Sequence, residues 1–282
     1  MIINGKQIAQ EIKDALKKET AMLPRKLRLD IVYAGTDPVI ENFLGMKIRV
    51  GEEIGIDTIV HRFPESISQE ELIIQIKSMA QNSAVDGMLV QLPLPKGMDI
   101  QEILNTVPPK KDVDVLSDPA LKLFAENKTE NISPVAGAFM EILKRNNVSL
   151  KDKKVVILGR GRLVGKPFAV CAEREGSDVT CLNSTTGDPL PYLLTADIIA
   201  IGIGKPHFIK PEMIREGVII LDGGTSEKDG KIVGDADPSC AEKCSIFTPV
   251  PGGIGPITVA LIFRNLLNSV KEINNALKSP LK

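Results

Sequence analysis

The 282-residue sequence has almost no net charge and no apolar run long enough to cross a membrane. Its 35 basic and 36 acidic residues give a formal net charge of -1, so no field favours nucleic acid or an anionic membrane. The first residues, MIINGKQIAQEIKDAL, carry charges too early for a signal peptide. We therefore expect a cytoplasmic protein with a small-molecule partner, and neither a nucleic-acid nor a membrane partner.

Cysteine and histidine are also scarce, with four and two residues respectively. Four scattered cysteines do not make a disulfide framework in a chain of this length, so we expect free thiols. Cys240 and Cys244 have the spacing of half a metal site, but His61 and His207 lie at no ligand spacing from them. We predict no metal. A serine or cysteine nucleophile with a histidine base is equally disfavoured, so Lys, Asp, Glu or Tyr must supply any acid or base.

Helical and strand patterns alternate along the first part of the chain, with no internal repeat. Residues 27–33 alternate as in a half-buried strand, and Asp37 followed by proline opens a helix. Ser68 and Glu71 have the spacing of a capping box, which begins another helix. Residues 88–90 are typical of a buried strand that ends in Gln-Leu-Pro-Leu-Pro. This order of elements predicts an α/β fold.

The second part of the chain contains a continuous apolar run at residues 155–158, which is typical of a parallel strand covered on both faces. Further strands are predicted at residues 178–182, 197–201 and 218–221, so we expect a doubly wound sheet. Residues 257–277 have helical periodicity, and we expect one long closing helix that packs back onto the first domain.

A glycine-rich turn, Gly-Arg-Gly-Arg-Leu-Val-Gly-Lys-Pro at residues 159–167, follows the strand at 155–158. Its glycines would let the backbone approach a pyrophosphate, whose charge the free amides at the following helix start would stabilise. The spacing is one residue longer than the usual dinucleotide motif, and a tight strand-to-helix turn in another α/β protein remains the alternative. We predict a dinucleotide site formed by Gly159, Arg160, Gly161, Val164 and Gly165.

The type of dinucleotide follows from the end of the next predicted strand. A site for NAD usually has an acidic residue there to hold the ribose hydroxyls, whereas this chain has Asn183-Ser184-Thr185. No carboxylate at this position would repel a 2′-phosphate. Arg160 or Arg162 would supply positive charge to bind it, and Ser184 would donate a hydrogen bond. The sequence therefore favours NADP over NAD. The alternative is that these arginines belong to a solvated loop.

Several longer segments resemble the bifunctional methylenetetrahydrofolate dehydrogenase/methenyltetrahydrofolate cyclohydrolase (FolD) family. They are Asp-Gly-Met-Leu-Val-Gln-Leu-Pro-Leu-Pro at 86–95, Lys-Asp-Val-Asp at 111–114, the glycine-rich turn, residues 196–206, and Thr-Pro-Val-Pro-Gly-Gly-Ile-Gly-Pro-Ile-Thr-Val at 248–259. The similarity runs in order over nearly the whole chain. It implies NADP-dependent oxidation of 5,10-methylenetetrahydrofolate and hydrolysis of the product to 10-formyltetrahydrofolate, in one-carbon metabolism and purine biosynthesis.

The resemblance also implies two domains: an N-terminal α/β substrate domain at residues 1–120 and 262–282, and a Rossmann-type NADP-binding domain at 121–261, with the last helix returning to the first domain. It implies Lys47 as the acid/base, Gln91 as its partner and Asp114 as the pterin anchor. Further implied contacts are Phe43, Pro251, Gly252 and Gly253 for folate, and Gly204, Thr225 and Thr258 for NADP. A homodimer through the cofactor domain is expected as well.

The chemistry makes these residue types sensible. Hydride loss leaves a cation shared with two flanking nitrogens, so that step needs placement more than it needs a base. Hydrolysis needs proton handling, which a lysine can supply if burial lowers its pKa and if its partner is neutral, as Gln91 is. Without the resemblance, Lys47 would be interpreted as an exposed helix lysine. For Asp114, a helix cap or a surface ion pair would be about as good an interpretation as a pterin anchor.

The chain departs from the family pattern at several positions. Phe43 stands where the family usually has tyrosine, Ile40 replaces a serine, and Val115 follows Asp114 where glycine is usual. Two alternatives therefore stay open. One is a dehydrogenase with weak or lost cyclohydrolase activity, and the other is a folate- or NADP-binding protein without catalysis.

Overall fold

The computed structural model describes the backbone of residues 1–228 and 230–278. The chain divides into two compact units. Unit 1 comprises Met1–Ala9 with Pro134–Thr258, and unit 2 comprises Gln10–Ser133 with Val259–Lys282. Residues 279–282, the end of the predicted substrate domain, lie outside the described residues. Within the described part of the chain, no helix is long and apolar enough to span a membrane.

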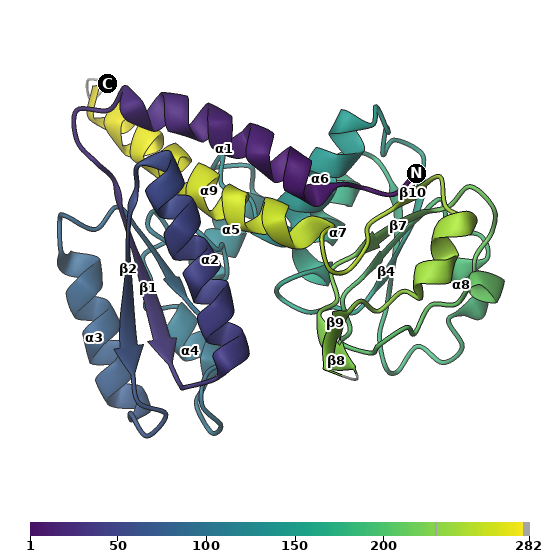
Figure 1. Ribbon diagram of the computed structural model, residues 1–282, viewed down its shortest axis with the longest axis horizontal. Helices are drawn as coiled ribbons and strands as arrows, with labels where there is room; N and C mark the ends of the chain where they lie inside the picture. Colours follow the sequence, from purple (N-terminus) through teal and green to yellow (C-terminus); the bar gives the residue numbers. More distant parts are fainter. Residues whose placement is uncertain (229, 279–282) are drawn as a thin grey trace. The chain divides into compact units, whose positions relative to one another are not determined.

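Unit 2 contains a three-stranded parallel sheet in the order β2-β1-β3, flanked by helices (Figure 1). Its elements are α1 (Gly5–Ala21, from Gln10 on), β1 (Arg28–Ala34), α2 (Pro38–Ile54), β2 (Asp57–Phe63), α3 (Gln69–Gln81), β3 (Gly87–Val90), α4 (Ile100–Leu104), α5 (Asp118–Ala125) and α9 (Ile254–Lys278, from Val259 on). The long closing helix is confirmed, and most of it belongs to unit 2, as predicted.

Local sequence fixes where the helices of unit 2 begin. The Asp37 carboxylate accepts a hydrogen bond from the Val39 amide at 2.7 Å and caps α2, while the Asp37 amide donates to the Tyr33 hydroxyl oxygen at 2.7 Å. At α3 the predicted capping box is present: the Glu71 amide donates to Ser68 Oγ, and the Ser68 amide donates to the Glu71 carboxylate. Each cap satisfies amides that a helix start leaves free.

The sequence analysis missed β2, which is an edge strand. Its side chains are exposed or half-buried along its whole length, and Ile59 is 38% exposed. An edge strand of this kind lacks the apolar run that marked β3. Strands β1 and β3 are buried on both faces. One of these faces packs against α3 and α4, where the cluster includes Val32, Leu72, Met88 and Ile103.

Unit 1 contains a five-stranded parallel sheet in the order β10-β7-β6-β4-β5 (Figure 1). Its elements are α6 (Pro134–Arg145), β4 (Lys154–Leu158), α7 (Gly165–Arg174), β5 (Asp178–Leu182), α8 (Leu190–Leu193), β6 (Ile198–Ile201), η1 (Pro211–Met213), β7 (Ile219–Asp222), β8 (Ser226–Lys228), β9 (Lys231–Val233), η2 (Pro238–Glu242) and β10 (Ile246–Phe247). The predicted doubly wound sheet is confirmed.

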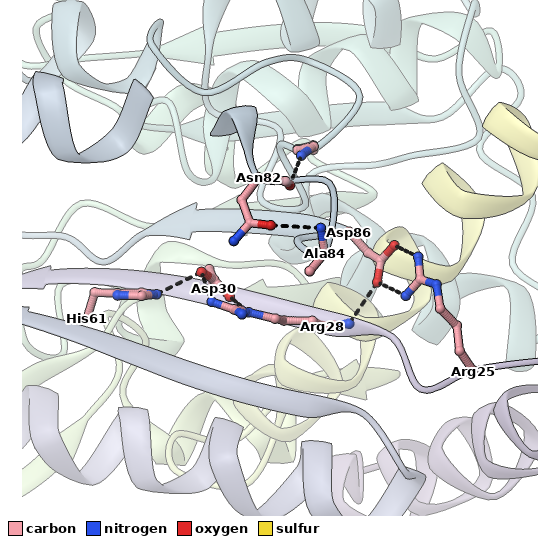
Figure 2. Close-up of polar contacts among 8 residues, drawn as sticks. Arg25, Arg28, Asp30, His61, Asn82, Ala84 and Asp86 are labelled. Carbon is pink, nitrogen blue, oxygen red and sulfur yellow. Dashed lines mark hydrogen bonds and ion pairs between the residues drawn. The ribbon is translucent and has the colours of Figure 1, made fainter. Parts of the chain in front are cut away.

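A charged network lies along the sheet of unit 2 (Figure 2). The fully buried Asp30 accepts hydrogen bonds from Arg28 Nε at 2.6 Å and Nη2 at 2.9 Å, and His61 Nε2 lies 2.7 Å from its Oδ2. Asp86 accepts from Arg25 Nη1 at 2.8 Å and from the Arg28 amide at 2.9 Å. The two carboxylates thus tie β1 to its neighbours.

We predict that Asp30→Ala lowers the free energy of unfolding by roughly 3 kcal/mol, because it leaves Arg28 without its buried partner. Asp57→Ala is the matched control: Asp57 is 58% exposed and lies 3.7 Å from Lys26 Nζ. Its loss should cost less than roughly 1 kcal/mol. Urea unfolding of both variants measures the difference, and equal losses would show that the buried network adds nothing.

Candidate active site

The predicted folate residues of unit 2 lie where its sheet changes winding direction. In the sheet, β1 lies between β2 and β3. The chain leaves β1 toward β2 on one side and then crosses to β3 on the other, so the carboxyl ends of β1 and β3 flank a switch point. Ligands of open parallel sheets bind at such points. Helix α2, which carries Phe43 and Lys47, follows β1, and Gln91 follows β3 directly. Chain topology therefore brings α2 and the Gln-Leu-Pro-Leu-Pro segment to one edge.

Lys47 and Gln91 are in direct contact at this edge. Lys47 is 8% exposed, and its Nζ donates to Gln91 Oε1 at 2.5 Å. Gln91 Nε2 donates to the Leu92 carbonyl oxygen at 2.7 Å, which turns the amide oxygen toward the lysine. The amide group is therefore fixed with its acceptor side facing Lys47.

Asp114 is brought to the same edge because the segment before it extends the sheet. Met88 in β3 forms a parallel bridge with Asp112, and the Val113 amide donates to the Met88 carbonyl oxygen at 3.2 Å. The fully buried Asn265 in α9 donates from Nδ2 to the Val113 carbonyl oxygen at 2.8 Å. Strand pairing on one side and α9 on the other thus hold the backbone next to Asp114.

The turn after Asp114 is folded around the buried carboxylate of Asp112. This carboxylate accepts hydrogen bonds from the amides of Asp114 at 3.2 Å, Leu116 at 3.1 Å and Ser117 at 2.8 Å. Val115, within this turn, has a φ of 55°, in the left-handed region that a β-branched residue rarely adopts. The backbone here has the conformation that glycine adopts without strain, although the chain carries valine.

Burial shifts the ionisation of both charged groups at this site. It lowers the pKa of Lys47 below that of an exposed lysine, although the nearby Asp114 carboxylate partly opposes the shift. It raises the pKa of Asp114 from 3.8 to about 6, although Lys47 opposes this shift. Each group is thereby moved toward the neutral pH range in which an acid or base works best.

The other predicted folate residues are placed separately. Phe43 is half-buried and lies one helical turn before Lys47 on α2, so both point from the same helix face. Pro251, Gly252 and Gly253 belong to unit 1, where the Gly5 amide donates to the Gly252 carbonyl oxygen at 2.9 Å. A Cβ added at Gly5 would lie 1.6 Å from the Gly253 oxygen, so this loop packs directly on the N-terminal segment.

In unit 1 the switch point lies between β4 and β6, and the glycine-rich turn follows β4. Gly159 has a φ of 96°, and a Cβ on Gly165 would lie 1.8 Å from the Gly159 oxygen. Both positions therefore require glycine. Val164, the N-cap of α7, makes no side-chain capping bond. In the first turn of α7 the Lys166 amide already donates to the Gly161 carbonyl oxygen at 3.1 Å, and Pro167 has no amide hydrogen. Of the helix-start amides that the sequence analysis expected, the Gly165 amide is therefore the one left for an anion.

Cations and hydroxyls surround this turn. Arg160 is exposed, and its charge partly opposes the effect of burial, which raises the pKa of the Cys181 thiol on β5. Arg162 Nη1 is buried and has no hydrogen-bond partner among the described residues. Ser184, just after β5, is exposed, and the adjacent Asn183 side chain accepts from the Thr185 amide at 2.9 Å. An orphaned guanidinium donor of this kind fits an anionic ligand.

The remaining predicted cofactor residues lie in the glycine-rich turn, in the loops after β6 and β7, and in α9. Gly161 is exposed in the turn, Gly204 follows β6, and Thr225 follows β7 and is exposed. Thr258 lies in the first turns of α9, where its Oγ1 donates to the carbonyl oxygens of Ile254 at 3.0 Å and Gly255 at 2.7 Å. Its hydroxyl is thus already bonded within the helix.

Two buried carboxylates in unit 1 were missed by the sequence analysis. Asp222, 1% exposed, ends β7, and Asp235, fully buried, follows β9. The available signal was an acidic residue directly after a continuous apolar run, and a Gly-Asp pair after the short segment Lys-Ile-Val. Neither pattern predicts which backbone amides donate hydrogen bonds to these carboxylates. Among the described residues, no cluster of His, Cys, Asp or Glu is arranged to hold a metal ion.

Two protein-family models match the chain. Residues 3–114 match the description "Tetrahydrofolate dehydrogenase/cyclohydrolase, catalytic domain", and residues 133–274 match "Tetrahydrofolate dehydrogenase/cyclohydrolase, NAD(P)-binding domain". The bifunctional protein FolD of Nautilia profundicola is 36% identical over 98% of this chain and 99% of its own length.

Solved structures agree with these matches. The bifunctional FolD dehydrogenase/cyclohydrolase of Campylobacter jejuni has a TM-score of 0.93 and 31% identity, covering 97% of this chain and 99% of its own. The Trypanosoma brucei enzyme, solved in complex with NADP cofactor and inhibitor, has a TM-score of 0.92 and 27% identity, covering 99% of each chain. The similarity therefore spans both units.

The raised pKa of Asp114 predicts a pH-dependent effect on stability. Between its unfolded value of 3.8 and its folded value of about 6, the folded protein holds the extra proton, so stability falls as pH rises through this window. Asp114→Asn removes this effect. The variant should therefore gain stability over the parent between pH 4 and pH 7, by at most about 3 kcal/mol.

Urea unfolding of both proteins at the two pH values measures the gain. Asp14→Asn, a change at an exposed carboxylate on α1, is the control and should show a constant difference from the parent. The same pH dependence in both variants would mean that burial does not set the ionisation of Asp114.

Proposed function

The chain belongs to the tetrahydrofolate dehydrogenase/cyclohydrolase family, and we propose on that premise how its own residues serve the two reactions. It oxidises 5,10-methylenetetrahydrofolate to 5,10-methenyltetrahydrofolate with NADP, and it hydrolyses that product to 10-formyltetrahydrofolate in one-carbon metabolism. The observation that carries the proposal is the buried Lys47 amine in contact with the Gln91 amide oxygen.

The residues of unit 1 fit NADP. The Gly165 amide at the start of α7 would contact the pyrophosphate, and a Cβ on Gly161 would meet nothing within 4 Å, so the turn leaves room for the anion. Arg160, Arg162 and Ser184 would bind the 2′-phosphate, and the absence of an acidic residue at the end of β5 supports this choice. NADP, when bound, accepts the hydride.

The dehydrogenase step needs positioning more than proton transfer. The carbon that loses the hydride lies between two nitrogens whose lone pairs stabilise the resulting cation. Asp114 would anchor the pterin by accepting two hydrogen bonds from the amino and amide N–H groups of the ring. Phe43 would stack on the substrate from the same helix that carries Lys47. These contacts would hold the carbon at a fixed place.

The cyclohydrolase step needs a group that takes and returns a proton. Water attacks the bridging carbon, and the neutral Lys47 amine accepts the proton that the water loses. The bond from that carbon to one nitrogen then breaks, and this nitrogen takes back the proton held by Lys47. The hydroxyl left on the carbon becomes the carbonyl of the formyl group on the other nitrogen, and its proton is released to solvent, so the reaction yields one proton overall. Burial favours the neutral amine, and the Gln91 amide orients it without stabilising its charge as a carboxylate would.

The bifunctional interpretation is favoured over the two alternatives that the sequence left open. The relatives that match over nearly their whole length carry the name bifunctional protein FolD. Lys47, Gln91 and Asp114 also lie at one edge of one sheet, which binding alone would not require. Phe43 keeps the aromatic surface and lacks only the hydroxyl.

Assembly and setting form a further part of the proposal. Resemblance to the family supports a homodimer through the cofactor unit, a cytoplasmic location and a role in purine biosynthesis, because 10-formyltetrahydrofolate carries a one-carbon group for synthesis. Sedimentation at micromolar concentration should give twice the 30.6 kDa chain mass. A monomer at that concentration would count against the dimer.

Lys47→Met separates the two activities. The variant should lose cyclohydrolase activity by at least about 100-fold, because general acid–base catalysis of this kind contributes roughly that factor or more. Dehydrogenase activity should remain measurable, because hydride transfer depends on position. The parent and the variant are supplied with methylenetetrahydrofolate and NADP, and NADPH and the formyl product are followed together.

The matched control is Lys77→Met on α3, which makes the same chemical change outside the site. Both activities should stay within about 2-fold of the parent there, since an exposed substitution disturbs little. Normal hydrolysis of methenyltetrahydrofolate by Lys47→Met, after subtraction of the uncatalysed rate, would return Lys47 to an ordinary helix residue. Absence of both activities in the parent would overturn the function itself.

A further inference from the structure

The loop that follows β6 is folded around a carboxylate from a distant part of unit 1. Asp235 Oδ2 accepts hydrogen bonds from the Ile203 amide at 2.6 Å and the Gly204 amide at 3.0 Å, and its Oδ1 accepts from the Lys205 amide at 2.7 Å. Three successive amides around one anion form the kind of concavity that proteins use for phosphate. Here the protein's own carboxylate occupies it.

The same carboxylate is pressed against the loop that follows β7. A Cβ on Gly224 would lie 2.4 Å from the Asp235 carboxyl carbon, so only glycine fits beside it. Gly224 immediately precedes Thr225. A reciprocal contact exists nearby: a Cβ on Gly234 would lie 2.2 Å from Asp222 Oδ2, which accepts from the Ala236 amide at 2.8 Å. The two carboxylates therefore lock the loops after β6, β7 and β9 together.

These loops border the switch point of the sheet. The loop after β6 touches the glycine-rich turn, because a Cβ on Gly159 would lie 3.0 Å from Ile203 Cγ2 and one on Gly202 would lie 2.6 Å from Val164 Cγ2. Parallel sheets bind dinucleotides in this crevice. Any displacement of the loop after β6 would therefore reshape the wall opposite the turn.

We propose that Asp235 is a positioning residue for the dinucleotide site. Its carboxylate fixes the position of Gly204 by accepting from the Gly204 amide, and it fixes the position of Thr225 through its contact with the preceding Gly224. The inference rests on the proposed NADP-dependent function and adds a residue that contacts no ligand. It also assigns the Gly204 amide to Asp235, so Gly204 meets the cofactor through its Cα or carbonyl group and not as a hydrogen-bond donor.

The test is NADPH binding by the full-length protein, followed by the fluorescence of the reduced nicotinamide. Asp235→Asn turns an N–H group toward amides that need an acceptor, and the dissociation constant should rise at least about 10-fold. The KM for NADP should rise in parallel, with a smaller change in dehydrogenase kcat. The hydrolysis of methenyltetrahydrofolate uses no cofactor, so its rate should fall by a smaller factor than the affinity for NADPH.

Two further variants keep the test decisive. Asp237→Asn is the matched control two residues away. The Asp237 carboxylate binds Lys210 and Ser239 and lies 3.9 Å from His207 Nδ1, whereas the amides of residues 203–205 donate to Asp235. The NADPH dissociation constant of this variant should stay within about 2-fold of the parent. Gly224→Ala displaces the Asp235 carboxylate without removing it and should weaken NADPH binding as Asp235→Asn does. Combining the two changes should add little, because both disturb one contact.

Parent-like NADPH affinity in Asp235→Asn would overturn the inference, and so would an equal loss of NADPH affinity and hydrolysis, which would mark a merely structural role. If Asp235→Asn does not fold, Gly224→Ala decides on the same criteria. A parent protein that binds no NADPH would overturn the proposed function itself, and the inference with it.

Discussion

The contact between the buried Lys47 amine and the Gln91 amide oxygen is the constraint on which the candidate site depends. An ammonium removed from water loses hydration that a neutral amide only partly replaces, so burial favours the uncharged amine. Asp114 supplies an opposing charge without forming the contact itself. The proposed acid/base is thus held in a fixed place beside Gln91, and its burial is only partly compensated.

The candidate site of each unit lies at the switch point of a parallel sheet, and in both units internal carboxylates shape the loops there. In unit 2 Asp112 gathers three amides and fixes the turn after Asp114. In unit 1 Asp235 gathers three amides after β6. A carboxylate that accepts several amides holds irregular backbone rigidly, because each buried amide needs an acceptor. Loop shape at both edges therefore depends on carboxylates whose hydrogen bonds go to backbone amides.

Local signals in the sequence predicted much of this architecture. The caps at Asp37 and Ser68 acted within a few residues, and the apolar run of β4 needed only its own composition. Strand β2 escaped detection because its exposed edge carries polar residues. The partners of Asp235 could not be foreseen, since they lie about thirty residues away and hydrogen bonds to backbone amides leave no mark on residue type.

The site residues came from resemblance to a family, and the structure adds the physical reason for some of them. The proposed chemistry requires a buried Lys47 beside the neutral Gln91 amide, and the structure contains both. The bond that turns Gln91 and the left-handed backbone at Val115 were not visible in the residues themselves. The ionisation of Lys47 can be measured directly by nitrogen and carbon NMR of lysine-labelled protein, with Lys47→Met to assign its signal. The account predicts a pKa for Lys47 clearly below those of the exposed lysines in the same spectra. A value equal to theirs or higher would contradict it.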